Sequence, residues 1–352
     1  MRKGKHVAGD KNTTWNDFSG IENPFGTPES FIDALADAAT SRIAFSQPDA
    51  HASVLKRALS STLMLPEETF IIGSSVSNMI SVTAQSFEAS TVGVMVPCPV
   101  EYVLAASNAG HRITRISGAS SYVAPDFATA TSQGNPFEAA ILSNPGFPTS
   151  RLLPKRILES YLESCDWVIV DERSIELTLG GKSFVSFVED HRNLIVIQSF
   201  AEQFAMPGVP VSYLVAHPDV VAEIERFYDK SGITTLPGIF ADSFSREYPK
   251  LDSVREFLAS EIPWMQTMLS LVPGIDIFPA EANFVMCMLN EATSPESIGS
   301  VGDLSNRLKD RRCIIRDLSG TPGIGNDASF SVAVRTRQEN LRLIEALRDI
   351  LA

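Results

Sequence analysis

Short apolar runs alternate with helical stretches along most of the chain, and this alternation limits the folds that it can adopt. Between the runs, apolar residues recur with helical spacing, as in residues 51–63 and 100–108. Buried runs joined by helices are typical of a mostly parallel sheet that is covered on both faces. The sequence therefore predicts an α/β fold whose strands lie near residues 69–73, 92–96, 139–142, 167–170, 194–197 and 212–215.

The pattern changes near residue 240, which indicates a second unit. Residues 251–271 have the spacing of one long amphipathic helix, interrupted or kinked at Pro263. Shorter strands and helices follow, an α+β pattern. A length of 352 residues also favours about two domains. We predict a large α/β domain over residues 41–245 and a smaller α+β domain made of residues 1–40 and 246–352.

Charge and cysteine content exclude several classes of protein. Asp and Glu number 42 against 29 Lys and Arg, a net charge of −13, which disfavours partners such as nucleic acids and anionic membranes. The four cysteines are far apart and show no metal-ligand spacing, so we predict reduced thiols and no metal site. No secretory signal and no long apolar stretch is present. We expect a cytoplasmic protein.

Ligands of open α/β sheets bind beyond the carboxyl ends of the strands. The candidate positions are therefore the turns at residues 73–78, 144–150, 171–174 and 199–208.

These turns resemble those of pyridoxal-phosphate (PLP) enzymes of fold type I. The residues that carry the resemblance are Asn-Pro-Phe-Gly at 23–26, Asn-Pro-Gly-Phe-Pro-Thr-Ser at 144–150, Val-Asp-Glu at 170–172, the loop at 199–213, Ala-Asn-Phe at 282–284, Ile-Arg-Asp at 315–317 and Ala-Val-Arg-Thr at 333–336. The chain is most similar to the branch of histidinol-phosphate aminotransferases and threonine-phosphate decarboxylases.

The resemblance implies the architecture and the assembly. It implies an aspartate-aminotransferase-like fold: a large domain with a mostly parallel seven-stranded sheet, and a smaller α+β domain. It also implies a homodimer whose clefts lie at the subunit interface, with the segment near Phe45 approaching the partner's cleft.

The same resemblance, followed residue by residue, shows departures at the positions that hold the cofactor. Glu202 stands where the family has the lysine that forms the Schiff base. Asp171, the family's partner of the pyridine nitrogen, is kept. Five further positions depart from the family: the phosphate arginine is Pro210, the asparagine on the phenolic oxygen is Phe147, the strand-end tyrosine is Ser174, the neighbouring subunit's tyrosine is Phe45, and the substrate-carboxylate arginine is Ser331. These losses predict that PLP is absent.

Glu202 and Asp171 are the predicted catalytic residues. A buried carboxyl has a raised pKa and can act as a general acid or base, and two neighbouring carboxyls push their pKa values apart. Alternatively, Glu202 turns toward solvent or pairs with a surface cation.

The remaining polar positions form the predicted substrate site. Ser74, Ser75 and Ser77 lie at a strand-to-helix turn, where backbone N–H groups can bind an anion, and Ser199 is expected to face the same point. Ordinary helix capping by serine is the alternative. Arg316 and Arg335 can hold a carboxylate or phosphate, or can form surface salt bridges. Asn144, Phe147 and Ser174 complete the predicted substrate site.

These residues predict a PLP-independent enzyme of amino-acid-derived small-molecule biosynthesis. It would use neither cofactor nor metal and would act by acid/base chemistry, such as cyclisation, dehydration or isomerisation, on an anionic small molecule. Two alternatives stay open. One is a catalytically inactive pseudo-aminotransferase, serving as a partner subunit or scaffold. The other is an enzyme that binds PLP non-covalently.

Overall fold

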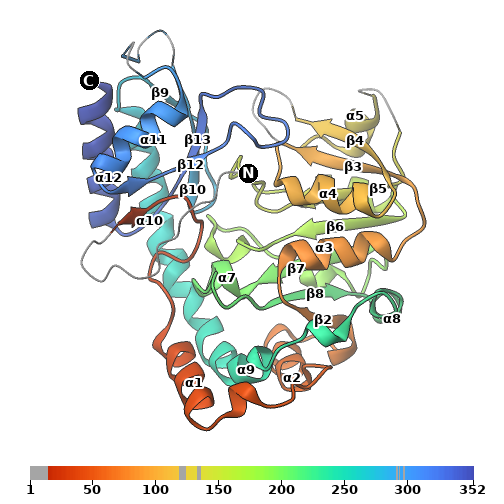
Figure 1. Cartoon of the computed structure of the whole chain (residues 1–352). Coiled ribbons are helices and arrows are strands. Elements are labelled where there is room, and N and C mark those ends of the chain that lie inside the picture. The colour runs from red at the N-terminus through yellow and green to blue at the C-terminus, as the bar shows by residue number, and fades with distance from the viewer. Residues whose placement is uncertain (1–14, 119–123, 133–135, 291, 293, 296–297) are drawn as a thin grey trace.

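A computed structural model shows a seven-stranded sheet and a four-stranded sheet connected by a long helix (Figure 1). It describes residues 15–118, 124–132, 136–290, 292, 294–295 and 298–352. The first fourteen residues of the predicted small domain lie outside the described residues. The division into residues 41–245 and residues 1–40 with 246–352 stays a prediction.

The larger sheet has seven strands in the order β2-β8-β7-β6-β5-β3-β4. All of them run parallel except β8, which is antiparallel to both of its neighbours. This confirms the predicted aspartate-aminotransferase-like architecture with a mostly parallel seven-stranded sheet. The strands are β2 (Phe70–Gly73), β3 (Thr91–Val96), β4 (Arg112–Ser117), β5 (Ala139–Ser143), β6 (Trp167–Asp171), β7 (Leu194–Ser199) and β8 (Ser212–Ala216).

Helices cover both faces of this sheet, so its central strands are buried completely. Every residue of β6 and β7 is buried, as expected for parallel strands packed on two sides. Ile169 packs in one core and Val168 in the other, because successive side chains point to opposite faces. One core includes α3 (Val76–Gln85), α4 (Val100–Asn108) and α8 (Pro218–Glu225), and the other includes α2 (Ser53–Leu63), α5 (Phe127–Ser132), α6 (Lys155–Leu162) and α9 (Leu236–Glu247).

The second sheet is antiparallel and has four strands in the order β12-β13-β10-β9. Thr336 and Glu339 form a capping box that starts the last helix of this part. The elements are β9 (Ile275–Ile277), β10 (Phe284–Leu289), α11 (Val301–Asp310), β12 (Arg316–Asp317), β13 (Ser329–Ala333) and α12 (Arg337–Leu351).

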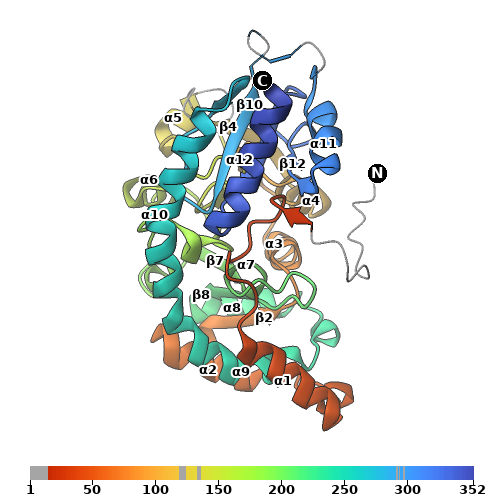
Figure 2. The same ribbon diagram turned by 90° about the vertical axis from the view of Figure 1, so that its left-hand side faces the viewer.

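The long helix α10 (Leu251–Ser270) runs from the large sheet to the small one and packs beside α12 (Figure 2). Its twenty residues span about 30 Å. Pro263 lies inside the helix, which nevertheless continues to Ser270. The prediction of one long helix over residues 251–271 is therefore confirmed to within a residue.

The N-terminal segment joins the two parts of the molecule. Its short strand β1 (Asn16–Asp17) pairs in parallel with β11 (Cys313–Ile314) beside the small sheet. Residues 20–27 then pass over the large sheet to α1 (Glu29–Thr40), whose Phe31 packs on Phe200, Phe204 and Phe240. The chain therefore crosses directly over the region between the two sheets.

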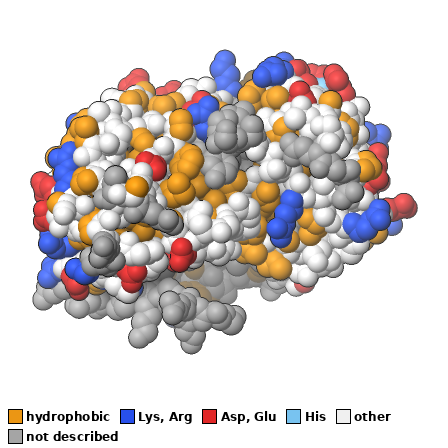
Figure 3. All heavy atoms as spheres, turned by 90° about the horizontal axis from the view of Figure 1, so that it is seen from above, with side chains coloured by type: hydrophobic (Ala, Val, Ile, Leu, Met, Phe, Trp, Pro, Cys, Tyr) orange, Lys and Arg blue, Asp and Glu red, His pale blue; other side chains and the backbone are white. Residues whose placement is uncertain are grey.

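Acidic and basic side chains are interspersed over the face shown in Figure 3, without one basic patch. None of the helices in the described ranges is both long and apolar enough to cross a membrane.

Candidate active site

A cavity of about 100 Å³ lies between the carboxyl ends of the large-sheet strands and the small sheet. Three of the four turns predicted to hold the ligand contribute to it, together with the N-terminal segment and one small-sheet residue. The lining consists of Gly20, Ile21, Glu22, Pro99, Glu101, Tyr102, Ser143, Pro145, Phe147, Asp171, Arg173, Ser174, Glu202 and Arg316.

Backbone contacts fix the position of Glu202 in this cavity. Strand β7 ends at Ser199, whose hydroxyl accepts a hydrogen bond from Ala201 N at 3.0 Å and so starts the short helix α7 (Phe200–Gln203). Asn23 N donates to Glu202 O at 2.9 Å, and Asn23 Nδ2 donates to Gln203 O at 3.0 Å. The N-terminal segment is therefore hydrogen-bonded to α7 through Asn23.

Asp171 ends β6 and is bound by three groups of the chain itself. Arg173 donates to Asp171 Oδ2 from Nε at 2.8 Å and from Nη2 at 2.6 Å. The hydroxyl of Tyr102 donates to the same oxygen at 2.6 Å, and Arg173 N donates to Oδ1 at 3.0 Å. The Arg173 side chain also reaches Glu101 Oε1 at 3.2 Å. Arg173 is therefore hydrogen-bonded to two carboxylates, those of Asp171 and Glu101, at the floor of the cavity.

Burial and the neighbouring charges shift the pKa values of Arg173 and Tyr102, the two side chains that bind Asp171. Burial lowers the pKa of Arg173, but the charges of Asp171, Tyr102 and Glu202, together with the hydrogen bond to Asp171, raise that pKa overall. The pKa of Tyr102 is well above its usual value because the phenol is buried and lies beside Asp171. Tyr102 therefore stays a hydrogen-bond donor to Asp171.

Glu202 has one carboxylate oxygen without a partner in the described chain, although a side-chain hydrogen bond with Ser199 lowers its pKa. Its Oε2 is completely buried and has no hydrogen-bond partner among the residues that the structure describes. Burial raises the pKa of Glu202; the charge of Arg173 lowers it and that of Asp171 raises it. The side chain lines the cavity and does not turn away to solvent.

Arg316 lies at the mouth of the cavity, on the small-sheet side. Its guanidinium stands over the ring of Phe147, 4.6 Å from the ring centre. The charges that act on it are those of Glu101, Arg173 and Glu22. Within the described ranges, no carboxylate oxygen lies within 4.0 Å of the Arg316 side-chain nitrogens. Arg316 is therefore an arginine without a close counter-charge.

The structure brings together five of the predicted site residues: Asp171, Glu202, Phe147, Ser174 and Arg316. Other predicted residues lie elsewhere. Ser74, Ser75 and Ser77 sit at the start of α3 and do not line the cavity, and Ser75 caps that helix by accepting from Asn78 N at 3.2 Å. Arg335 also lies outside the cavity lining, and Ser199 is buried beneath Glu202.

Asn144 belongs to a separate buried network. Its Nδ2 donates to Glu172 Oε1 at 3.0 Å, and its Oδ1 accepts from Leu153 N at 3.0 Å. Glu172 also accepts from Ser183, Gln198 and the backbone of Phe184. Burial raises the pKa of Glu172 to about 7, although these hydrogen bonds pull it down.

The sequence analysis missed Arg173, Tyr102 and Glu101. A signal for Arg173 exists, since it follows the predicted strand end at Asp171 by two residues. Tyr102 and Glu101 lie in the first turns of α4, and only the fold shows that this helix begins beside β6.

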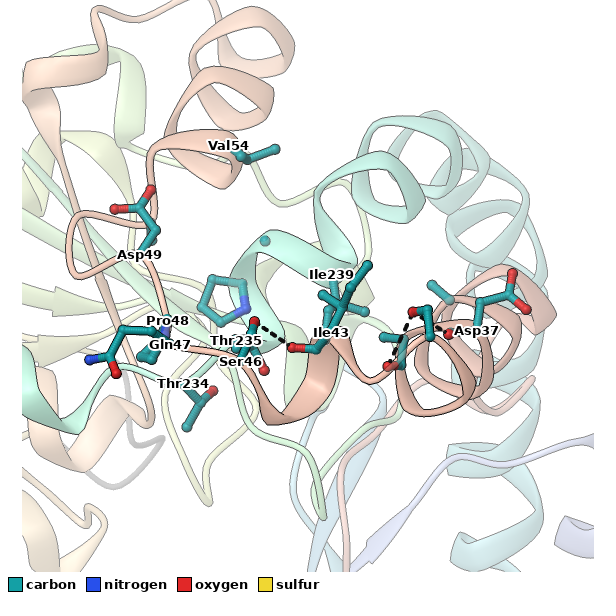
Figure 4. A pocket seen from close by; sticks show the side chains of 16 residues that line it. Asp37, Ile43, Ser46, Gln47, Pro48, Asp49, Val54, Thr234, Thr235 and Ile239 are labelled. Atoms are coloured by element: carbon teal, nitrogen blue, oxygen red, sulfur yellow. Dashed lines mark hydrogen bonds between the residues drawn. The ribbon is translucent and has the colours of Figure 1, made fainter.

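A larger cavity of about 460 Å³ lies between α1, the start of α2 and α9 (Figure 4). Ile43, Pro48, Val54 and Ile239 give it an apolar wall. None of the residues predicted for the active site lines it. Among the described residues, no group of three or more His, Cys, Asp or Glu side chains is placed to hold a metal ion.

Comparison with known proteins identifies relatives along almost the whole chain. The family model for class I and II aminotransferases matches residues 14–347. The histidinol-phosphate aminotransferase 2 of Archaeoglobus fulgidus is 28% identical over 94% of this chain and 92% of its own. The threonine-phosphate decarboxylase of Salmonella typhimurium is 25% identical over 95% and 91%. The structure of the Sinorhizobium meliloti histidinol-phosphate aminotransferase in complex with pyridoxal-5'-phosphate matches with a TM-score of 0.81 at 16% identity, covering 95% of this chain and 90% of that one.

These relatives correct the predicted function. They are enzymes named as aminotransferases and decarboxylases, and the S. meliloti enzyme holds PLP. The expectation of a PLP-independent enzyme, and that of a pseudo-aminotransferase, is therefore wrong, as is the expectation that PLP is absent. PLP is the cofactor to be expected in this family.

The cavity itself does not fit PLP bound through a lysine imine. Within the described residues no lysine lines it, and Glu202 cannot form an imine. Both oxygens of Asp171 already accept hydrogen bonds from the chain. What the arrangement offers is a carboxyl with a raised pKa in its depth and, at its mouth, a guanidinium without a close carboxylate in the described residues.

Proposed function

Because the chain belongs to the family of class I and II aminotransferases, we propose that it is an enzyme whose cavity binds a small anionic compound derived from an amino acid. The names of its relatives support this class of ligand, since histidinol phosphate and threonine phosphate both carry a phosphate and an amine. The observation that carries the proposal is the Arg316 guanidinium, which stands at the cavity mouth without a close carboxylate in the described part of the chain.

Arg316 supplies the charge that such a compound requires. An arginine can bind a phosphate or a carboxylate with two parallel hydrogen bonds. Phe147 supports the guanidinium from one side, which leaves the other side for a ligand. The phosphate can come from a substrate or from PLP, and the experiment separates these two sources.

We assign proton transfer in this site to Glu202. Its raised pKa lets the carboxyl take up and release a proton closer to neutral pH than an ordinary glutamate does. Asp171 has a different role in this proposal, because it is held by Arg173 and Tyr102 and orients those side chains.

Two titrations test the proposed function. O-phospho-L-serine is titrated by calorimetry as the substrate-like anion, and PLP is titrated by its absorbance. We expect at least one probe to bind. Arg316→Ala should lower the affinity for that probe by about 10- to 100-fold, which corresponds to the loss of a charge-assisted hydrogen bond. The matched control Arg335→Ala removes an arginine outside the cavity and should leave the affinity within about twofold. Failure of both probes to bind at millimolar concentration, or an unchanged affinity in Arg316→Ala, would contradict the proposal.

We further propose that the protein is a homodimer, and a cytoplasmic location stays a prediction. Large apolar side chains lie exposed on α1 and just after it, with Phe45 80% exposed and Ile43 55% exposed. Ile43 also lines the cavity of Figure 4. Burying such side chains against a second copy is favourable by about 1.5–3 kcal/mol each. Light scattering should give twice the 38.3 kDa mass of one chain, and a monomer at micromolar concentration would contradict the proposal.

A further inference from the structure

Glu202 has one carboxylate oxygen, Oε2, that is buried in this cavity without a hydrogen-bond donor from the described chain. Asp171 is paired with Arg173, and Glu101 shares the same arginine at 3.2 Å. Glu202 has no ion pair in the described residues, and its Oε2 has no donor. A buried acceptor without a donor costs about 1–3 kcal/mol, and more when it is charged. A ligand that brings a donor to this carboxyl would recover that free energy.

The charges around the cavity favour a cationic donor over a neutral one. The lining holds two arginines and four carboxylates, a formal excess of two negative charges. Arg173 acts on Glu202 through its charge but is hydrogen-bonded to Asp171, and Arg316 lies at the mouth. No Lys, Arg or His nitrogen of the described chain lies within 4.0 Å of the Glu202 carboxylate. The depth of the cavity therefore attracts a positive group, while Arg316 attracts a negative group at the entrance.

The size of the cavity agrees with a small charged head. A volume of about 100 Å³ is less than the roughly 150 Å³ of an engineered apolar cavity that binds benzene. It suits an amine, its carbon and one further small group, with the rest of the ligand extending past Arg316.

We propose that Glu202 recognises a protonated amine, so that the ligand of this cavity is a compound with an ammonium group in the depth and an anionic group on Arg316. The inference rests on the proposed function and adds to it the residue that selects the amine. The raised pKa of Glu202 agrees with it, because an arriving ammonium would lower that pKa and drive a proton from the carboxyl.

A matched pair of probes tests the recognition of the amine. O-phospho-L-serine and 3-phospho-L-glycerate share a carboxylate, a phosphate and the configuration at C2 but differ in an ammonium against a hydroxyl. We expect wild-type protein to bind phosphoserine about 10- to 100-fold more tightly, as a buried charge-assisted hydrogen bond allows. Glu202→Gln should reduce this preference to about threefold or less, with folding checked by circular dichroism. Glu22→Gln, which changes another carboxylate of the same cavity, should keep the preference.

The outcomes separate this inference from the proposed function. Equal affinity for the two probes in wild type, or an unchanged preference in Glu202→Gln, overturns the inference and leaves anion binding intact. Failure of both probes to bind refutes both. If Glu202→Gln does not fold, Glu202→Ala takes its place, and an unchanged preference for phosphoserine in that variant would overturn the inference.

Discussion

Arg173→Met tests whether one arginine holds the acidic floor of the cavity together. In the wild type, Arg173 donates twice to Asp171 and once to Glu101. The side chain of Asp171 is 2% exposed and that of Arg173 is 20% exposed. Methionine fills a similar volume but leaves Asp171 buried without its counter-charge. It also removes the charge that lowers the pKa of Glu202.

The expected loss follows from these contacts. Removing one partner of a buried ion pair costs about 3–5 kcal/mol. Asp171 keeps its hydrogen bonds from Tyr102 and from the backbone of residue 173, and Arg173 is partly exposed, so the lower end applies. We expect Arg173→Met to lower the free energy of unfolding by about 3 kcal/mol at pH 7.5.

Urea unfolding followed by tryptophan fluorescence and circular dichroism measures this loss. Glu101→Gln is the matched control, because it removes only the 3.2 Å contact between two half-buried groups and should cost less than about 1 kcal/mol. The double variant Arg173→Met with Asp171→Asn should recover part of the loss, since it removes the unpaired charge. A loss below about 1 kcal/mol in Arg173→Met would refute this account of the cavity floor.

Two further predictions concern the scaffold around the site. The pKa of Glu172 is about 7 in the folded protein, against an ordinary value near 4.5. Between these two pH values Glu172 binds more protons in the folded protein than in the unfolded chain, so the free energy of unfolding should fall as pH rises through this range. Over pH 5 to 8, wild type should therefore lose about 2–3 kcal/mol more than Glu172→Gln in urea titrations, and parallel profiles would contradict this. Ser75→Ala removes the N-cap of α3 and should lower the free energy of unfolding by about 1 kcal/mol, whereas Ser74→Ala, at an exposed position, should change it by less than about 0.5 kcal/mol. Equal effects of the two alanines would contradict the assignment of the cap.

The large sheet could be predicted from the sequence because its strands are buried on both faces. The runs at 167–170 and 194–197 are wholly apolar and mostly β-branched, a pattern that surface strands do not show. The direction of β8, which runs antiparallel to the other strands of the large sheet, could not be predicted in this way. Its residues are as apolar as those of the other strands.

The candidate site was only partly accessible to sequence reasoning. Asp171 and Glu202 could be placed because each follows a predicted strand end, and these ends meet at one edge of the sheet. The role of Arg173 depends on the direction of its side chain, which bends back onto Asp171 two residues earlier. Ser75 shows the converse: its position suggested an anion site, whereas its hydroxyl accepts from the backbone of its own helix.

The expectation that PLP is absent was wrong because it inferred the loss of the cofactor from substitutions at individual contact positions. Glu202 and Phe147 do stand in the cavity, as their places in the sequence indicate. A residue at a family position shows what it can contact, but relatives over nearly the full chain set what kind of enzyme is to be expected.

A crystal structure of the wild-type protein grown with O-phospho-L-serine tests the central claim most directly. The account predicts that the ammonium lies within hydrogen-bond distance of the Glu202 carboxyl and that an anionic group of the same molecule lies on the Arg316 guanidinium. The molecule bound with its amine directed away from Glu202, or bound only at the start of α3 beside Ser74, would contradict it.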